Sequence, residues 1–324
     1  GMFWRGENEA FYTLVRDTID GVKAVASNQG ASVRVGSAGF VHKIVENLDL
    51  EGNVAQGFIE AVGADRLDFF SAHYYGACQD EKAEDGWNWL SSLRNKLNER
   101  GLQDKPLHIT EWNVSIGSAC PNEYFSAQEV QAFTGSMLTM MQDHFLNVEA
   151  AHFYAGIPNM GLFTVDEDQR FVVRPSAWSF WAHSLLQGGT ILRAEVCGTD
   201  SCYPAGSTTN FNVMGTSVRK GNTVYALLTN LTKNPKDLIV RFKGVDLTNA
   251  TVRFHRPPKF EDGAVVVDSE LVEGVIQPTL DGVENLAALI SIDEPALQLD
   301  MQQADSVVSV PGHTVAVVEL TIPE

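Results

Sequence analysis

The chain alternates four times in succession between a short apolar segment and a segment with helical periodicity. The apolar segments begin near residues 32, 67, 107 and 148. In the segments between them, apolar residues recur at the spacing of one helix face. Strands that alternate with helices in this way form a parallel sheet covered by helices. The apolar segments also lack strict polar–apolar alternation, as expected for strands that are buried on both faces.

Local signals place the ends of several of these elements. Ser126 followed by Glu129 predicts a capping box at the start of one helix, and Pro175 suits the first turn of another. The strands are expected over residues 32–36, 67–73, 107–112 and 148–154. The helices are expected over residues 7–27, 53–62, 87–100, 126–145 and 175–186.

The pattern changes after about residue 190, where helical periodicity disappears. Short β-rich runs separated by Gly, Asn, Asp and Pro take over, at 224–228, 237–242, 251–254 and 314–320. Such runs are typical of a β-sandwich. The sequence therefore predicts two domains of different class: residues 1–191 built from four βα units, and residues 192–324 forming a β-sandwich.

The charge of the chain limits its partners. Its 41 acidic and 23 basic residues give a net charge of −18 over 324 residues. Such a field repels nucleic acid and anionic membranes, and a neutral substrate is easier to accept than a polyanion. No apolar run approaches the roughly 20 residues needed to span a bilayer. We therefore expect neither a nucleic acid nor a membrane as a partner.

The four cysteines leave two interpretations open. Cys197 and Cys202 bracket a short loop, and Cys78 and Cys120 each follow a predicted strand, on loops that would share one face. Two disulfides would favour a secreted or periplasmic protein, although no signal peptide occurs at the N-terminus. Four free thiols in a cytosolic enzyme are the alternative. No metal-binding spacing such as Cys-x-x-Cys occurs, and we expect neither a metal nor a cofactor.

The segment from Pro106 to Asn113 carries the strongest sign of chemistry. This apolar strand, Leu-His-Ile-Thr-Glu-Trp-Asn after the proline, ends in the carboxylate of Glu111. In a parallel barrel, side chains at the carboxyl ends of strands point into the mouth of the active site. A glutamate held there can attack a sugar carbon or transfer a proton. A strand that simply ends in a solvated acid is the alternative.

These segments resemble a retaining glycoside hydrolase of clan A, and most of all family 39, the β-xylosidase and α-iduronidase group. The resemblance covers roughly residues 3–190. It implies that the first domain is part of a TIM-type barrel and that a β-sandwich follows it. The stretches that carry it are Phe3-Trp-Arg-Gly6, Val33-Arg-Val-Gly36, Phe69-Phe-Ser-Ala-His73-Tyr-Tyr75, His108-Ile-Thr-Glu111-Trp-Asn113, Gly161-Leu162 and Arg174-Pro175.

The resemblance also implies roles for individual residues. Glu111 would be the nucleophile that forms a glycosyl–enzyme intermediate. Tyr74 or Tyr75, with Tyr75 favoured by the motif's spacing, would donate a hydrogen bond to it. His73 would position a sugar hydroxyl or pack as a core histidine. Trp112 would stack on a sugar face, and Asn113 and Tyr154 complete the expected substrate-binding set.

A retaining glycosidase needs a second carboxyl group about 5–5.5 Å from the nucleophile. In the family that the chain resembles, this acid/base glutamate closes the fourth barrel strand, in a motif like Asn-Glu-Pro-Asn. Its place would be shortly before Phe3, so the sequence leads us to expect that the acid/base and the first four βα units are missing. Glu9 follows an asparagine but is better explained as a first-turn acid of a helix, and Glu123 is a weaker substitute.

Two functions remain in competition. The first is a glycoside hydrolase, or its remnant, that acts on or binds a neutral saccharide. The second is a catalytically inactive carbohydrate-binding or assembly protein with the same fold. A Ser–His hydrolase is disfavoured because no Gly-x-Ser-x-Gly elbow occurs. Half a barrel also exposes two sheet edges, which a homodimer, the sandwich or a further polypeptide could cover.

Overall fold

The computed structural model of the chain consists of two compact units. The first comprises Gly1–Gly76, Asp85–Asn113 and Met141–Tyr154, and the second comprises Ala77–Glu84, Val114–Met140 and Ala155–Glu324. The structure describes residues 6–78, 82–115, 120–156, 160–197, 202–204, 212–243, 249–257, 265–267, 269–272, 275–279, 291–293 and 305–323.

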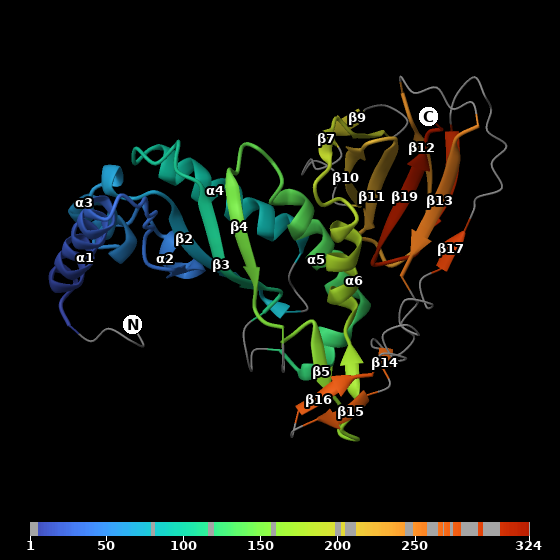
Figure 1. Cartoon of the computed structure of the whole chain (residues 1–324), viewed down its shortest axis with the longest axis horizontal. Helices are drawn as coiled ribbons and strands as arrows, with labels where there is room; N and C mark the ends of the chain where they lie inside the picture. Colours follow the sequence, from blue (N-terminus) through green and yellow to red (C-terminus); the bar gives the residue numbers. More distant parts are fainter. Residues whose placement is uncertain are drawn as a thin grey trace. The chain divides into compact units, whose positions relative to one another are not determined.

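The first unit is built on a four-stranded parallel sheet (Figure 1). Its strands lie in the order β1-β2-β3-β4, and each pair of neighbours is parallel. This is the arrangement that four successive βα units predict. The strands are β1 (Phe40–Val41), β2 (Phe70–Tyr75), β3 (Leu107–Asn113) and β4 (Val148–Phe153).

Three helices of the first unit lie where the periodicity predicts them, and the short helix at His42–Glu46 was not predicted. They are α1 (Asn8–Asn28), α2 (His42–Glu46), α3 (Val54–Val62) and α4 (Ala83–Asn98), with a 3₁₀ turn at Ala64–Arg66. Asn53 begins α3 because its side chain accepts hydrogen bonds from the N–H groups of Ala55 and Gln56. The core beneath the helices is mainly apolar, with Phe58, Phe70 and Leu90 completely buried, and it also contains the buried side chain of Arg94.

The strand predicted at residues 32–36 is wrong. The structure has an isolated parallel bridge between Gly36 and Phe69, and β1 begins only at Phe40. The Asp68 N–H donates to the Val35 carbonyl and the Ser37 N–H to the Phe69 carbonyl, so the backbone pairing is confined to the residues around Gly36. The segment therefore runs beside β2 without a regular ladder. The carboxylate of Asp68 accepts the Val35 N–H in place of a strand partner.

The second unit combines two helices with antiparallel sheets. The helix α6 (Pro175–Ser184) begins with Pro175 in its first turn, as predicted. The helix α5 (Gln128–Met140) is shorter than predicted and lacks the expected Ser126 cap, because Asn122–Ser126 form a separate 3₁₀ helix. At its other end, the Asp143 side chain accepts the Phe145 N–H and forms a turn where the helix was expected to continue.

A six-stranded antiparallel sheet dominates the C-terminal half, in the order β17-β13-β19-β11-β10-β7. The pair β12-β18 packs on it through a shared core that contains Val308, Val318 and Phe254. The strands of the six-stranded sheet are β7 (Thr190–Leu192), β10 (Val213–Lys220), β11 (Thr223–Asn230), β13 (Thr251–Arg256), β17 (Ser291–Asp293) and β19 (Thr314–Thr321). Those of the pair are β12 (Lys236–Arg241) and β18 (Asp305–Val310).

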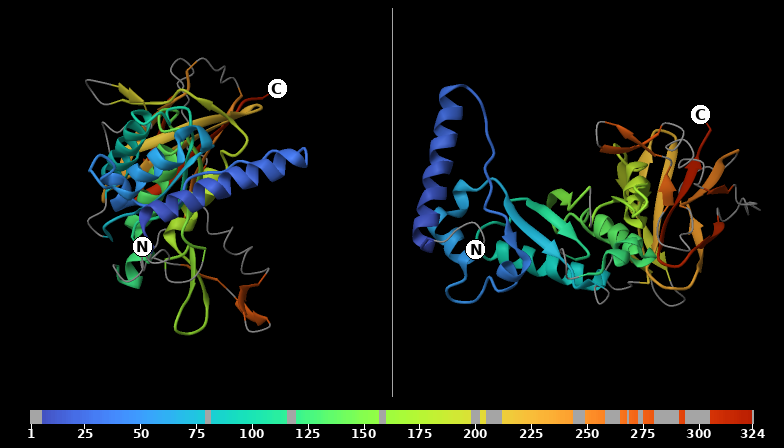
Figure 2. Two further views of the ribbon diagram at one scale, coloured as in Figure 1. Left: turned by 90° about the vertical axis from the view of Figure 1, so that its left-hand side faces the viewer. Right: turned by 90° about the horizontal axis from the view of Figure 1, so that it is seen from below.

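Smaller strands complete this unit, and α5 and α6 lie against the large sheet (Figure 2). Buried Ala182 and Leu186 pack on Val317 there. The predicted boundary at residue 192 coincides with β7, and as a domain boundary it stays a prediction. The smaller strands are β5 (Phe163–Val165), β6 (Phe171–Val173), β8 (Glu195–Cys197), β9 (Cys202–Pro204), β14 (Val265–Val267), β15 (Ser269–Val272) and β16 (Val275–Pro278).

The predicted fold class is confirmed: a partial TIM-type barrel of parallel strands is followed by a C-terminal β-sandwich. Two disulfides join Cys78 to Cys120 and Cys197 to Cys202, with Cα–Cα distances of 5.6 Å and 4.0 Å. They agree with the first of the two interpretations of the cysteines. Within the described ranges, no helix has the length and apolar character of a membrane span.

Candidate active site

A β-bulge in β3 determines where Glu111 points. Ala72 pairs with Ile109, whereas the next residue of β2, His73, pairs with Glu111. Thr110 is therefore an extra residue in β3, and the pairing with β4 shifts over the same stretch. A bulge re-aims the side chains that follow it. It places Glu111 beside His73, at the carboxyl end of the sheet, where sequence reasoning expected the site.

Two side chains of β2 contact one oxygen of Glu111. The Tyr75 hydroxyl donates a hydrogen bond of 2.7 Å to Oε2, and His73 Nδ1 lies 3.3 Å from the same Oε2. Among the described residues, Oε1 takes part in no hydrogen bond or ion pair. The Glu111 side chain is 36% exposed.

The environment of Tyr75 keeps its hydroxyl protonated. Burial raises the pKa of Tyr75 first, and the hydrogen bond to Glu111 and the charge of Glu111 raise it further. Of the two tyrosines that the sequence left open, Tyr75 makes this contact, and Tyr74 instead packs against Trp89 on the helix side.

Tyr154 lies next to this pair at the end of β4. Its ring meets the Tyr75 ring edge-on at a centroid distance of 6.3 Å, and it is 44% exposed. The Asn113 side chain donates a 2.6 Å hydrogen bond to the Tyr154 carbonyl and so ties the ends of β3 and β4 together. The structure thus brings together four of the predicted site residues, Glu111, His73, Tyr75 and Tyr154.

Two other predicted contacts with substrate are corrected by the structure. Trp112 has no exposed surface, and its ring packs edge-on against Phe153 at 5.0 Å. It follows Glu111 in the strand and so points to the opposite, helix-covered face. Asn113 is also fully buried. Neither side chain is available to a sugar in this structure, and both belong to the support of the site.

A second polar cluster lies at the amino ends of the same strands. Arg34 makes two hydrogen bonds of 2.8 Å and 2.6 Å to the Glu149 carboxylate, and His108 Nε2 lies 2.9 Å from it. The bonds from Arg34 and His108 lower the pKa of Glu149 to about 2. This acid is fully ionised at neutral pH, so it cannot donate a proton as a general acid.

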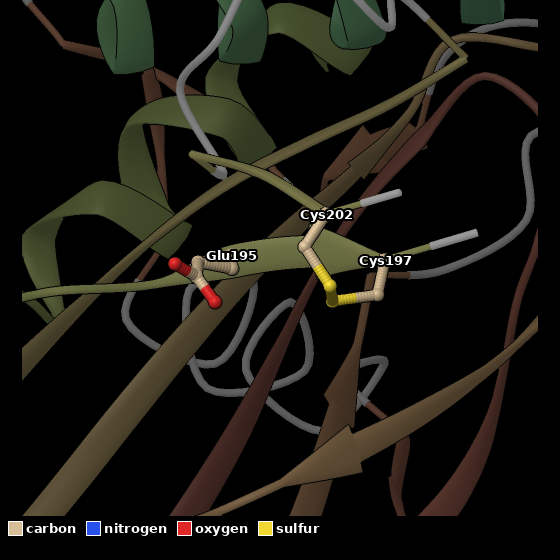
Figure 3. Close-up of side chains that lie close together, drawn as sticks. All are labelled: Glu195, Cys197 and Cys202. Carbon is tan, nitrogen blue, oxygen red and sulfur yellow. A yellow bond between two sulfur atoms is a disulfide. The ribbon is translucent and has the colours of Figure 1, made fainter. Parts of the chain in front are cut away.

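Other features do not compete with this site. A cavity of about 310 Å³ is lined by side chains of α2 and α4, including Trp89, and by none of the predicted site residues. Glu195 lies near Cys197 and Cys202 in the described part of the chain (Figure 3). Both sulfur atoms are in a disulfide and Glu195 pairs with Arg193 at 2.6 Å, so this group does not offer thiolates to a metal.

The residue that sequence reasoning missed is Thr110. Ile109 and Trp112 are both buried, with the two polar residues Thr110 and Glu111 between them. Two consecutive polar residues inside an otherwise alternating strand are the signal of a bulge. The candidate acid Glu9 lies in the first turn of α1, as the sequence indicates. Phe3 and Trp4, and the side chain of Glu123, lie outside the described residues.

Comparisons with known proteins bear on the fold of the chain. No family model matches the chain, and no curated protein matches its sequence. Several solved structures match its fold. A family 51 α-L-arabinofuranosidase from Thermotoga petrophila is 11% identical with a TM-score of 0.64, and the match covers 97% of this chain and 62% of that one.

Two further structures extend the comparison. A family 39 β-xylosidase from Caulobacter crescentus is 16% identical with a TM-score of 0.55, and the match covers 97% of this chain and 62% of that one. A family 86 β-porphyranase from Bacteroides plebeius is 13% identical with a TM-score of 0.56, with coverages of 99% and 54%. The chain therefore spans less than two thirds of the length of each. It shares its fold with clan A glycoside hydrolases, family 39 among them, which is the group that its sequence resembles.

Proposed function

We propose that the protein acts on a neutral oligo- or polysaccharide as a retaining glycoside hydrolase, with Glu111 as the nucleophile. The observation that carries the proposal is that the two oxygen atoms of the Glu111 carboxylate have different surroundings. Tyr75 and His73 contact Oε2, and Oε1 is left without a partner among the described residues. The glycosidases of the same fold, and the net charge of −18, support a neutral sugar as the ligand.

In this mechanism, Oε1 of Glu111 attacks the anomeric carbon, and the bond from that carbon to the leaving oxygen breaks. The leaving oxygen takes a proton from an acid, and water later displaces Glu111 and releases the sugar. The Tyr75 hydroxyl holds Oε2 of Glu111 through its 2.7 Å hydrogen bond. His73 holds the carboxylate in place, and the exposed Tyr154 ring offers a surface to the sugar.

The acid is not assigned to a residue. Among the described residues, the hydrogen bonds and ion pairs of Glu111 involve Tyr75 and His73 and no second carboxyl group. General-acid catalysis contributes about 10²–10⁴-fold to such reactions. An aryl glycoside with a good leaving group needs little protonation, so it is the substrate on which this site is expected to act without that help.

The first prediction concerns Glu111→Gln, which keeps the size of the side chain and removes the nucleophilic oxygen. We expect turnover of nitrophenyl glycosides to fall by at least about 100-fold. A 2-fluoro-glycoside inactivator should add one sugar to the wild type, on the peptide that contains Glu111, by mass spectrometry. The matched control is Glu99→Gln, whose side chain is 73% exposed on the surface. Unchanged turnover in Glu111→Gln would remove Glu111 from the mechanism.

A catalytically inactive carbohydrate-binding protein is the second candidate. The observation that favours it is that the sequence contains no Asn-Glu-Pro-Asn motif, in which the acid/base glutamate is expected. Calorimetric titration with xylo-oligosaccharides separates the two functions. Binding that persists in Glu111→Gln, without turnover of any aryl glycoside by the wild type, would favour this candidate.

We also propose that two copies of the chain associate through the open edge of the barrel sheet. Within the described residues, β1 pairs only with β2, and α1 beside it carries the exposed apolar residues Leu14, Val22 and Val25. Unpaired edges and exposed apolar surface are the usual sites of association. The test is the mass of the protein in solution.

A further inference from the structure

The His73 ring lies between two neighbours, one at each nitrogen. Its Nδ1 is 3.3 Å from Oε2 of Glu111. Its Nε2 faces Gly39, in the segment that leads into β1. A Cβ atom added to Gly39 would lie 2.6 Å from Nε2 and 3.3 Å from Cδ2 of the ring. The same Cβ would lie 3.3 Å from Oγ1 of Thr110, the bulge residue next to Glu111. All four residues belong to the first unit.

Gly39 is needed for space rather than for backbone conformation. It does not have a positive φ, in contrast to Gly30, Gly52 and Gly63 in the same unit. A residue with a side chain can therefore adopt the backbone of Gly39 without strain. A Cβ atom at residue 39 would overlap the His73 imidazole, because Cβ contacts shorter than 3.0 Å essentially never occur in real structures.

We propose that Gly39 is a positioning residue of the Glu111 site, because its missing side chain is what allows His73 to reach the nucleophile. The inference rests on the proposed function for its consequence in catalysis. The contact itself is a matter of geometry. An added methyl group displaces the ring, and the contact between Nδ1 and Oε2 is lost. Glu111 then keeps Tyr75 as a partner of Oε2, and its carboxylate gains freedom to rotate.

The kind of atom that the added Cβ meets decides the outcome. At Gly39 that atom is the far end of a side chain that is 20% exposed, so the ring can move while the backbone stays in place. At Gly312, by contrast, the added Cβ would overlap the backbone carbonyl of Lys233, which cannot move in the same way. We therefore expect Gly39→Ala to fold normally and to change the site, whereas Gly312→Ala would change stability.

The experiment is a double-mutant cycle of Gly39→Ala and His73→Ala, measured as kcat/KM on a nitrophenyl glycoside. We expect Gly39→Ala alone to lower kcat/KM about 10-fold, since misplacement by about 1 Å can cost up to 10²-fold. In the His73→Ala background there is no ring to displace, so adding Gly39→Ala should change kcat/KM less than about twofold. The control is Gly21→Ala in α1, where an added Cβ meets no atom within 4 Å.

A second measurement does not depend on turnover. The ring C–H signals of His73, assigned in NMR spectra by their loss in His73→Ala, should shift in Gly39→Ala and stay in place in Gly21→Ala. Unshifted signals in Gly39→Ala, or an equal loss of kcat/KM in both backgrounds, would overturn the role of Gly39. Shifted signals together with full activity of Glu111→Gln would instead support the contact between residue 39 and the His73 ring and reject the proposed function.

Discussion

At the scale of single residues, the site depends on how two oxygen atoms of one side chain are used. The Tyr75 hydroxyl donates to Oε2 of Glu111 and His73 Nδ1 lies 3.3 Å from it, whereas Oε1 has no partner among the described residues. Tyr75 is 5% exposed, and burial and Glu111 raise its pKa, so its hydroxyl is protonated and donates to Oε2 at neutral pH. Removal of this one hydroxyl should therefore be costly.

The variant Tyr75→Phe tests this directly. A hydrogen bond to a charged group contributes about 1.5–3 kcal/mol, and each 1.4 kcal/mol corresponds to a factor of about 10. We expect kcat on aryl glycosides to fall between about 10-fold and 100-fold, with little change in the melting temperature. The matched control is Tyr12→Phe, which removes a 2.9 Å bond to the Val54 carbonyl away from the site. Equal kcat in Tyr75→Phe and the wild type would mean that the bond does not serve catalysis.

At the scale of elements, the strands β2, β3 and β4 could be predicted because apolar runs of their length have few other uses. The sequence did not predict the bulge at Thr110, which reverses the direction of Glu111 relative to simple alternation. It also placed a strand at residues 32–36, where the Phe69 ring lies on Gly36. The bulge also explains Trp112, which was expected to stack on a sugar but is buried on the helix-covered face. Such errors arise because contacts between strands are absent from local patterns.

The helix pair α5 and α6 offers a prediction about pH. His183 of α6 lies 2.8 Å through Nδ1 from the Ser179 carbonyl and 3.4 Å through Nε2 from Oγ1 of Thr139 in α5. Burial lowers its pKa to about 4. Between pH 6.5 and 4 the unfolded chain binds a proton that the folded chain does not, so the free energy of unfolding decreases as the pH falls through this range. The loss is at most about 3 kcal/mol.

Urea unfolding at pH 7 and at pH 4.5 measures this effect. Because other groups also titrate, the informative quantity is the difference between the wild type and His183→Gln, which keeps a side-chain amide for the Ser179 carbonyl. The fall in stability between the two pH values should be smaller in His183→Gln. His144→Gln, an exposed histidine, should behave like the wild type. An identical fall in all three proteins would show that the pKa of His183 is the same in the folded and the unfolded chain.

At the scale of the whole molecule, the class of each half followed from the sequence, because the change from βα repeats to short strands near residue 190 is a change of periodicity. How the parallel sheet is completed did not follow from it. The family 51 and family 39 structures are each longer than this chain, which covers 62% of either. In the described part of the sheet, β1 and β4 are the outer strands. A barrel sheet with open edges needs a cover to be stable in water.

The solution mass tests whether a second copy provides this cover. The helix α1 lies at the β1 side of the sheet (Figure 1), and its Leu14, Val22 and Val25 are 54%, 42% and 57% exposed. If two copies meet there, light scattering should give about twice the 35.5 kDa of one chain. The charge of −18 on each copy opposes association, so the fraction of dimer should be larger at 0.5 M salt than at 0.05 M salt.

The position of the interface can be tested with two valines. Val25→Lys places a charge in the apolar stripe of α1 and should produce the mass of a single chain. Val307→Lys is the matched control, because Val307 is 65% exposed on β18 in the other unit. That variant should keep the mass of the wild type. A wild-type mass near 35.5 kDa at all protein and salt concentrations would reject the dimer, and equal dissociation by both variants would reject α1 as its interface. Because the exposed stripe lies on α1 and the site on β2 and β3, a monomeric result would leave the proposal for Glu111 intact.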